Sequence, residues 1–579
     1  MYINGPLLIL AGAGSGKTKT LTHKAAYLIQ EKKISPQSIL LLTFTNKAAE
    51  EMKKRVEKIA GTTPGFAGTF HSFCAKILRC EAEKINLSRR FLIFDENDQK
   101  DVINDILKKM DLSPKLFRPQ QVLATISQAK NELISPFDYP DYARSPFQKQ
   151  VAVIYSLYQK KLKEQEALDF DDLLAETVRV LKNFPEILSA YQDRYRYILV
   201  DEWQDTNHAQ YEMIRLLAKK YKNLCVVGDA SQSIYSWRGA DYRNITLLKD
   251  DFPQLKIVNL EQNYRSTQKI LNAAFEIIKS NRSHPILKLW TLNQKGENVK
   301  VYEAKNENDE AQFLVKQIVG SNRPYSDFAV LYRTNAQSRA IEEVFLHAGL
   351  PYSLIGGVRF YERKEIKDVL AFLRYLANPK DETALKRIAK LGIRKMEKFL
   401  IIAKENSIEG KTTTELIDFI LEKTGYWDLY DPEIEEDLSR LENIKELRSV
   451  ASEFPDIYNF LENIALVENE YFPDKKVERD KLDHKDRVTL MTMHAAKGLE
   501  FPIVFIVGME EGLFPHSRTL LEPLEMEEER RLCYVAFTRA KEKLILSYSY
   551  RRLYFGSVSS NPPSRFISDL PQDLIDLLQ

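Results

Sequence analysis

Residues 11–18 have the types and spacing of a loop that binds a polyphosphate. They follow an apolar run at residues 7–10, so a short strand would lead into the loop. Glycines permit positive φ and close approach, which lets successive backbone N–H groups surround phosphate oxygens. Lys17 would reach the β- and γ-phosphates, and Thr18 a magnesium ion. The predicted nucleotide-binding residues are Ala11, Gly12, Ala13, Gly14, Ser15, Gly16, Lys17 and Thr18. The usual pattern has glycine in place of Ala11, which is a mild change.

A second apolar run, residues 197–200, ends in the neighbouring acids Asp201 and Glu202. The carboxyl ends of parallel strands form the ligand edge of such a sheet. Asp201 would hold magnesium, and Glu202 would orient or deprotonate an attacking water. Paired acids at a strand end more often cap the next helix. Their combination with the glycine loop favours nucleoside triphosphate hydrolysis.

A third set of candidates follows the strand predicted at residues 224–229. Gln232 is placed to sense the γ-phosphate or the water. Tyr235, Trp237 and Arg238 combine aromatic faces with a cation, which suits stacking on unpaired bases and contact with backbone phosphate. A tryptophan in a loop more often packs in a core, but this one lies a few residues from the γ-phosphate sensor.

The remaining strands predict the scaffold that positions these residues. One series of apolar strands lies at 7–10, 39–45, 197–202, 224–229 and 256–260, and a second at 299–303, 328–332, 352–355, 488–492, 503–508 and 543–548. Helical patterns separate the strands, which indicates parallel α/β sheets. Each series is interrupted by more than a hundred residues of helical pattern. We therefore expect two parallel sheets, each with a helical insertion.

Composition excludes several other classes of protein. The 579 residues include 84 basic and 82 acidic side chains, so a nucleic-acid surface must be a local groove. Four scattered cysteines predict a reducing, cytoplasmic setting without a metal-cysteine site. The sequence has no signal peptide and no apolar run long enough for a membrane span, so no membrane partner is expected.

The order of motifs along nearly the whole chain resembles the UvrD/PcrA/Rep group of superfamily 1 DNA helicases. The matching stretches are AGAGSGKT, LLTFTNKAAEEM, GTFHSF, ILVDEWQDTN, VVGDASQSIYSWRGAD, LEQNYRST, VLYRTNAQSR, VTLMTMHAAKGLEFPIVFIVGMEEGLFPHSR and EEERRLCYVAFTRAKEKL. The resemblance implies two RecA-like P-loop motor domains, each with a mainly helical inserted subdomain. It places the first motor domain at 1–80 and 191–262 around an insertion at 81–190, and the second at 263–357 and 488–579 around an insertion at 358–487.

The resemblance also implies ATP as the nucleotide, with Mg²⁺. In the matching motifs Tyr264 stacks on adenine, Arg265 binds the γ-phosphate and Glu500 lies near the ribose. Arg539 is implied to be an arginine finger, a cation that stabilises charge on the γ-phosphoryl oxygens in the transition state. The catalytic set is therefore Lys17, Glu202, Gln232, Arg265 and Arg539.

The DNA-binding residues implied by the family pattern are Phe44, Thr45, Thr69, Phe70, His71, Tyr235, Trp237, Arg238, His494, His516 and Phe555. Phe70 is equally compatible with the core, and His71 and His494 with core or hinge positions. The chain departs from the family at three places: no glutamine-containing segment precedes residue 7, the second insertion is short, and no partner-recruiting tail follows Phe566.

The sequence thus predicts a monomeric ATP-driven motor that acts on single-stranded DNA and single-strand/duplex junctions. The resemblance implies 3′ to 5′ movement and duplex unwinding in repair or replication. A translocase that strips proteins from DNA with little unwinding shares every motor residue, and the short insertion favours it somewhat. A DNA-binding module switched by ATP is less compatible with Glu202, Gln232 and Arg539. A fused helicase-nuclease is disfavoured because no acidic nuclease segment follows residue 550.

Overall fold

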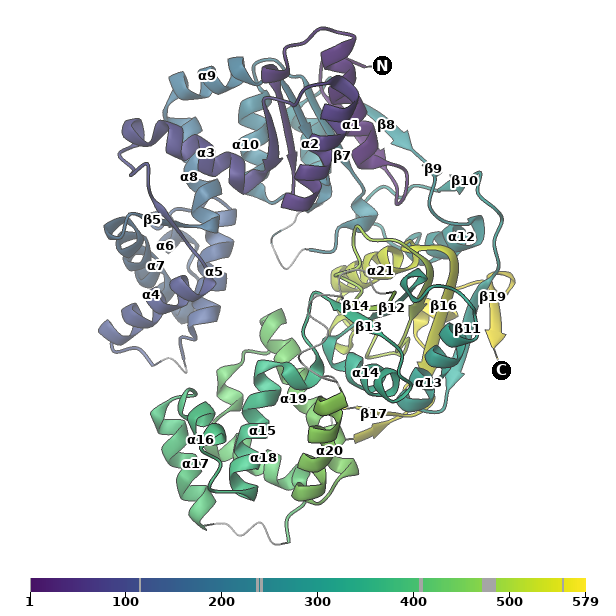
Figure 1. Cartoon of the computed structure of the whole chain (residues 1–579). Helices are drawn as coiled ribbons and strands as arrows, with labels where there is room; N and C mark the ends of the chain where they lie inside the picture. Colours follow the sequence, from purple (N-terminus) through teal and green to yellow (C-terminus); the bar gives the residue numbers. More distant parts are fainter. Residues whose placement is uncertain are drawn as a thin grey trace. The chain divides into compact units, whose positions relative to one another are not determined.

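The structure is a computed structural model that describes residues 2–113, 116–235, 239, 243–405, 410–470, 486–554 and 557–578. The chain forms two compact units (Figure 1). Unit 1 contains Met1–Tyr264 and His284–Trp290, and unit 2 contains Arg265–Ser283 and Thr291–Gln579. Within the described part of the chain, no helix combines the length and apolar composition of a membrane span.

The described residues of unit 1 form a six-stranded parallel sheet in the order β3-β2-β6-β7-β1-β8. These strands are β1 (Leu7–Ala11), β2 (Ile39–Thr43), β3 (Phe66–Thr69), β6 (Tyr197–Val200), β7 (Leu224–Gly228) and β8 (Lys256–Leu260). Helices α1 (Lys17–Gln30), α2 (Asn46–Ala60), α3 (Phe70–Glu81), α10 (His208–Ala218) and α11 (Asn244–Asp251) accompany the sheet. Its central strands are buried apolar runs, as expected where helices cover both faces.

An inserted, mainly helical region of unit 1 lies between α3 and β6. Its elements are β4 (Leu92–Phe94), α4 (Glu96–Lys109), α5 (Pro119–Asn131), α6 (Tyr139–Tyr142), α7 (Pro146–Glu164), β5 (Ala167–Asp169), α8 (Phe170–Asn183) and α9 (Pro185–Arg194). Apolar residues of α4, α5 and α7 form a core of their own. The buried Lys130 ammonium lies 2.6 Å from Asp169 and 2.8 Å from Asp172, which ties α5 to the start of α8.

Unit 2 contains a seven-stranded parallel sheet, counted over its described residues, in the order β13-β14-β12-β15-β16-β11-β19. The strands are β11 (Val299–Ala304), β12 (Phe328–Tyr332), β13 (Tyr352–Ile355), β14 (Val488–Thr492), β15 (Phe501–Ile506), β16 (Ala540–Ser549) and β19 (Ile575–Leu578). Helices α12 (Gln268–Ile278), α13 (Glu307–Val319), α14 (Ser338–His347) and α21 (Pro523–Phe537) accompany them, and α22 (Arg565–Ser568) is a short helix near the carboxyl end.

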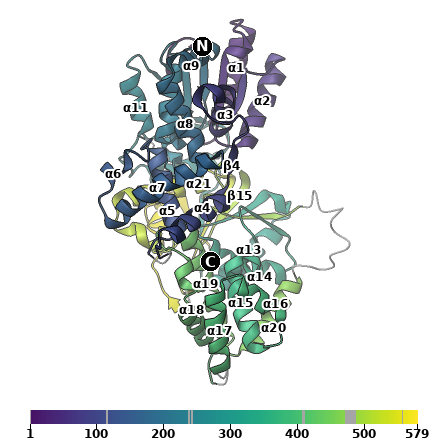
Figure 2. The same cartoon turned by 90° about the vertical axis from the view of Figure 1, so that its left-hand side faces the viewer.

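The insertion of unit 2 lies between β13 and β14. It is entirely helical in its described residues (Figure 2). Its helices are α15 (Lys364–Ala377), α16 (Glu382–Ala389), α17 (Ile393–Glu405), α18 (Thr413–Thr424), α19 (Glu435–Glu453) and α20 (Ile457–Glu470). After β16, the antiparallel strands β17 (Arg552–Tyr554) and β18 (Ser557–Ser559) form a hairpin.

The prediction of two parallel sheets with helical insertions is confirmed, and every predicted strand is present. The sequence analysis missed the edge strands β3 and β19, the short pairs β4-β5 and β17-β18, and the two-residue strands β9 (Gln262–Asn263) and β10 (Trp290–Thr291). These strands have four residues or fewer, and β3 includes a glycine. Such short segments lack the apolar run that identifies a buried strand.

Candidate nucleotide and DNA sites

The loop between β1 and α1 has the backbone conformation that its glycines predict. Gly14 and Gly16 have φ values of 64° and 83°, in the left-handed region that favours glycine. Gly16 is the N-cap of α1, so the first N–H groups of this helix face the loop. At Gly12 a Cβ atom would lie 2.3 Å from Leu289 Cδ2, and a side chain there would force the loop to move.

Lys17 and Glu202 lie together at the carboxyl edge of this sheet. Lys17 Nζ is buried and 3.4 Å from Glu202 Oε2, and it has no hydrogen-bond partner among the described residues. A buried ammonium without hydrogen bonds is costly, and a phosphate oxygen would supply them. This arrangement fits the phosphate-binding role predicted for Lys17.

Thr18 and Asp201 form the candidate magnesium site. The Thr18 hydroxyl donates a 2.7 Å hydrogen bond to Asp201 Oδ2. Burial, and then repulsion from the Glu202 carboxylate, raises the pKa of Asp201 to about 7. A hard divalent cation prefers such hydroxyl and carboxylate oxygens, and its charge would offset the cost of burying two neighbouring acids. The residues present therefore fit Mg²⁺.

Gln232 belongs to a chain of hydrogen bonds that links the ends of β6 and β7. Its Nε2 donates to Asp229 Oδ2 at 2.6 Å, and the Asp229 N–H donates to Gln204 Oε1 at 2.9 Å. The amide of Gln204 then donates to Glu202 Oε2 at 2.6 Å. Sequence reasoning did not single out Gln204, although its position two residues after Glu202 in the same motif was a usable signal.

The segment after β8 supports the phosphate loop from the other side. Asn263 Nδ2 donates to the carbonyl oxygen of Ala13 at 2.7 Å, and the Tyr264 N–H donates to that of Gly14 at 3.0 Å. The sequence analysis did not identify Asn263 as a residue that supports the phosphate loop. The Tyr264 side chain is 66% exposed, so its ring has a free face that suits stacking on a base.

In unit 2, Arg265 and Glu500 form an ion pair. Arg265 Nε donates to Glu500 Oε2 at 2.6 Å, and Lys541 Nζ lies 2.9 Å from the other carboxylate oxygen. Burial alone would raise the pKa of Glu500. The hydrogen bond from Lys541 and the positive charge of Arg265 outweigh this effect of burial, so the pKa of Glu500 is lowered. Glu500 is therefore an anion held between two cations.

Arg539 lies inside unit 2, just after α21. The residue is 1% exposed, and its guanidinium donates to the carbonyl oxygens of Val535 and Leu499 and to the Thr538 hydroxyl. The role of Arg539 as an arginine finger therefore stays a prediction. In this conformation the guanidinium packs against the end of α21.

Four of the predicted DNA residues of unit 1 lie at or just after the carboxyl ends of β2 and β3, again at the carboxyl edge of the sheet. Phe44 is half-buried, and its ring centre is 5.5 Å from that of Phe70. Phe70 is 1% exposed and packs in the core. A contact with DNA would require its ring to leave this position, and the contact stays a prediction. The Thr45 and Thr69 hydroxyls cap α2 and α3.

The other predicted DNA residues have mixed placements. The His71 ring lies edge-on to the Phe170 ring, with 5.8 Å between the ring centres. Burial lowers the pKa of His71. Tyr235 is half-buried. His516 Nε2 lies 3.2 Å from Glu442 Oε1 of α19. Trp237, Arg238 and Phe555 lie outside the described residues.

His494 is expected to remain neutral throughout the physiological range. Burial, with the nearby charges of Arg333 and Lys497, lowers its pKa to about 3. The ring would therefore meet DNA by hydrogen bonding or stacking and not as a cation. In histidine-labelled protein, the NMR signal lost in His494→Asn should not shift between about pH 5 and pH 8. A titration midpoint near the ordinary value would contradict this.

Comparison with known proteins identifies the family. Residues 1–253 match the UvrD/REP helicase N-terminal domain, and residues 258–437 and 426–551 match the UvrD-like helicase C-terminal domain. The chain is 46% identical to a protein of Staphylococcus epidermidis RP62A named ATP-dependent DNA helicase PcrA, over 99% of this chain and 85% of the relative. The protein of the same name from Staphylococcus aureus Mu50 is 45% identical over the same shares. The chain belongs to the UvrD/REP helicase family.

Proposed function

We propose that the chain is an ATP-dependent DNA helicase that moves 3′ to 5′ on single-stranded DNA and separates duplex at junctions, in repair or replication. The observation that carries the proposal is the buried Lys17 ammonium at the mouth of the glycine loop, 3.4 Å from Glu202. In this pair a residue that would bind phosphate, Lys17, lies beside a candidate general base, Glu202. The relatives named as ATP-dependent DNA helicases support DNA as the polymer on which the enzyme acts.

In this proposal the residues of unit 1 bind ATP and prepare the attacking water. The loop N–H groups and Lys17 hold the phosphates, Tyr264 stacks on adenine, and Thr18 and Asp201 hold Mg²⁺. The bound ion would neutralise charge on the phosphates. Glu202, held by Gln204, orients or deprotonates the water, and Gln232 senses the γ-phosphate.

For unit 2 we propose that Arg265 binds the γ-phosphate, that Glu500 lies near the ribose and that Arg539 acts as the arginine finger. Because Arg539 is buried here, this last role requires its bonds to Val535 and Leu499 to break during the ATPase cycle. The residues predicted to bind DNA contact the single strand. We further propose the domain and insertion boundaries expected from the sequence, and a motor that acts as a monomer in the cytoplasm.

Strand displacement tests the proposal directly. On partial duplexes with either a 3′ or a 5′ single-stranded tail, the protein should release the labelled strand only with ATP and Mg²⁺ and much faster from the 3′-tailed substrate. ATP hydrolysis should rise strongly when single-stranded DNA is added. Equal ATPase rates with and without DNA would contradict a motor, and preference for the 5′ tail would contradict the polarity.

A translocase that displaces proteins is the second candidate, which the short second insertion favours. The same substrates should then carry a protein block on the single-stranded tail. Removal of the block without strand release would establish the translocase. Release of both the protein block and the labelled DNA strand would establish the helicase.

A further inference from the structure

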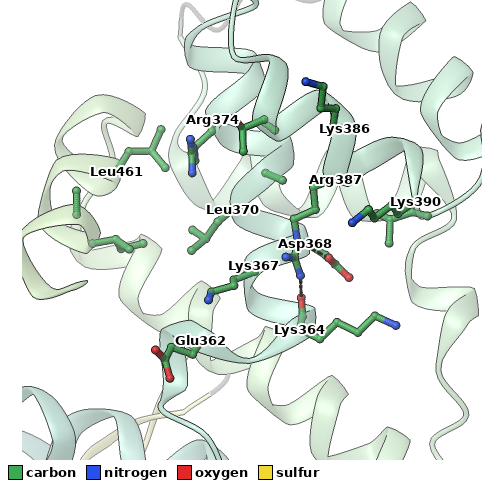
Figure 3. A pocket seen from close by; sticks show the side chains of 16 residues that line it. Glu362, Lys364, Lys367, Asp368, Leu370, Arg374, Lys386, Arg387, Lys390 and Leu461 are labelled. Atoms are coloured by element: carbon green, nitrogen blue, oxygen red, sulfur yellow. Dashed lines mark hydrogen bonds and ion pairs between the residues drawn. The ribbon is translucent and has the colours of Figure 1, made fainter. Parts of the chain in front are cut away.

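A groove in the helical insertion of unit 2 has an apolar floor and a basic rim, and the proposed motor function does not use it. Its volume is about 1090 Å³, and it is lined by residues of α15, α16 and α20 (Figure 3). In Figure 3, Leu370 of α15 lies in the middle, Leu461 of α20 on one side, and Lys386, Arg387 and Lys390 on the other.

The floor of the groove is formed by aliphatic side chains. Leu370 and Ala371 of α15, Ala384 of α16 and Ile464 of α20 are buried beneath it. On α20, Tyr458 precedes Leu461 by three residues and is 58% exposed, so helical spacing extends this apolar face by one turn.

The basic residues of the rim differ in whether they are already paired. Arg387 Nε donates to Asp368 Oδ1 at 2.7 Å, and Arg374 Nη2 donates to Asp381 Oδ2 at 2.7 Å. Lys364, Lys367 and Lys390 form no ion pair with any residue that the structure describes. The groove therefore offers ammonium groups beside an apolar floor, with Glu362 as the one unpaired acid among its described lining residues.

The length of the groove matches a short helix. Its lining residues on α15 run from Lys364 to Arg374, which at about 1.5 Å per residue spans about 15 Å. A helix of about ten residues has the same length. Amphipathic helices bind in this manner, with apolar side chains at helical spacing inserted into a groove.

We propose that this groove is a docking site for an acidic amphipathic helix of a partner protein. Leucine-like side chains of the partner occupy the floor between α16 and α20. Its carboxylates meet Lys364, Lys367 and Lys390. Duplex DNA fits less well, because its sugar-phosphate surface offers nothing apolar to cover Tyr458 and Leu461, and protein–DNA interfaces are polar and wet.

The test uses the full chain and fluorescein-labelled helical peptides of about fourteen residues. The acidic probe has leucines at i, i+3, i+4 and i+7 with glutamates between them. One matched peptide replaces the glutamates by lysine, and another replaces the leucines by serine. By fluorescence anisotropy the acidic probe should bind about tenfold more tightly than either matched peptide. Equal binding of the three would overturn the proposal.

Variants of the chain locate the binding. Lys367→Glu/Lys390→Glu should weaken the acidic probe about tenfold and strengthen the lysine peptide. Tyr458→Ser/Leu461→Ser should weaken the acidic probe without reversing the charge preference. The control Lys404→Glu/Lys423→Glu, which makes the same charge change outside the groove, should leave peptide binding unchanged. If the groove variants instead reduced binding of a blunt DNA duplex and left peptide binding intact, the surface would be a DNA site and the proposal wrong.

Discussion

Lys17→Ala is expected to lower DNA-stimulated ATP hydrolysis by a factor on the order of 10² to 10³. The ammonium is held at the loop where it can neutralise the transferring phosphoryl group, and it has no hydrogen bond in the described structure that would tie it to another role. Alanine also leaves Glu202 without the cation that lies 3.4 Å away. Steady-state phosphate release with saturating single-stranded DNA measures the loss.

Lys19→Ala is the matched control for this experiment. Lys19 lies two residues further along the same helix, is exposed and takes part in no interaction with the phosphate loop that the structure shows. The control should retain wild-type turnover and wild-type thermal stability. If Lys17→Ala kept more than about half of the wild-type rate, the proposed role of Lys17, and with it the site, would be wrong.

The sequence predicted the nucleotide site well because the chemistry there is local. Residues 11–18 form a loop whose conformation depends on their own glycines, and the acids after residues 197–200 reach the edge simply because parallel strands end there. The support given by Gln204 and Asn263 was missed. These amides contact residues far along the chain, and no periodic pattern marks such contacts.

Burial was the other property that the sequence could not decide, since it left Phe70 equally compatible with the core and with DNA binding. Phe70 and Arg539 sit in motifs full of functional residues, yet both are 1% exposed. What covers each side chain comes from other segments: Phe44 packs beside Phe70, and Leu499 accepts a bond from Arg539. A motif fixes the type and order of residues, whereas exposure depends on packing across the whole unit.

Arg552→Met is expected to destabilise unit 2 by about 3 to 5 kcal/mol. Arg552 begins β17, and its buried guanidinium donates to Glu310 Oε2 at 2.6 Å and to Glu510 Oε1 at 2.7 Å. Methionine fills a similar space but leaves two carboxylates buried without their shared cation. Urea unfolding, followed by circular dichroism, measures the change in the free energy of unfolding.

Two controls separate the charge from the loss of packing. Arg565→Met removes a bidentate pair with Glu511, but these side chains are 39% and 18% exposed, so solvent screens the pair and its loss should cost less than the loss of Arg552. In the triple variant Glu310→Gln/Arg552→Met/Glu510→Gln the buried charges are gone, so much of the stability should return. If Arg552→Met cost no more than Arg565→Met, the cluster would not stabilise the unit.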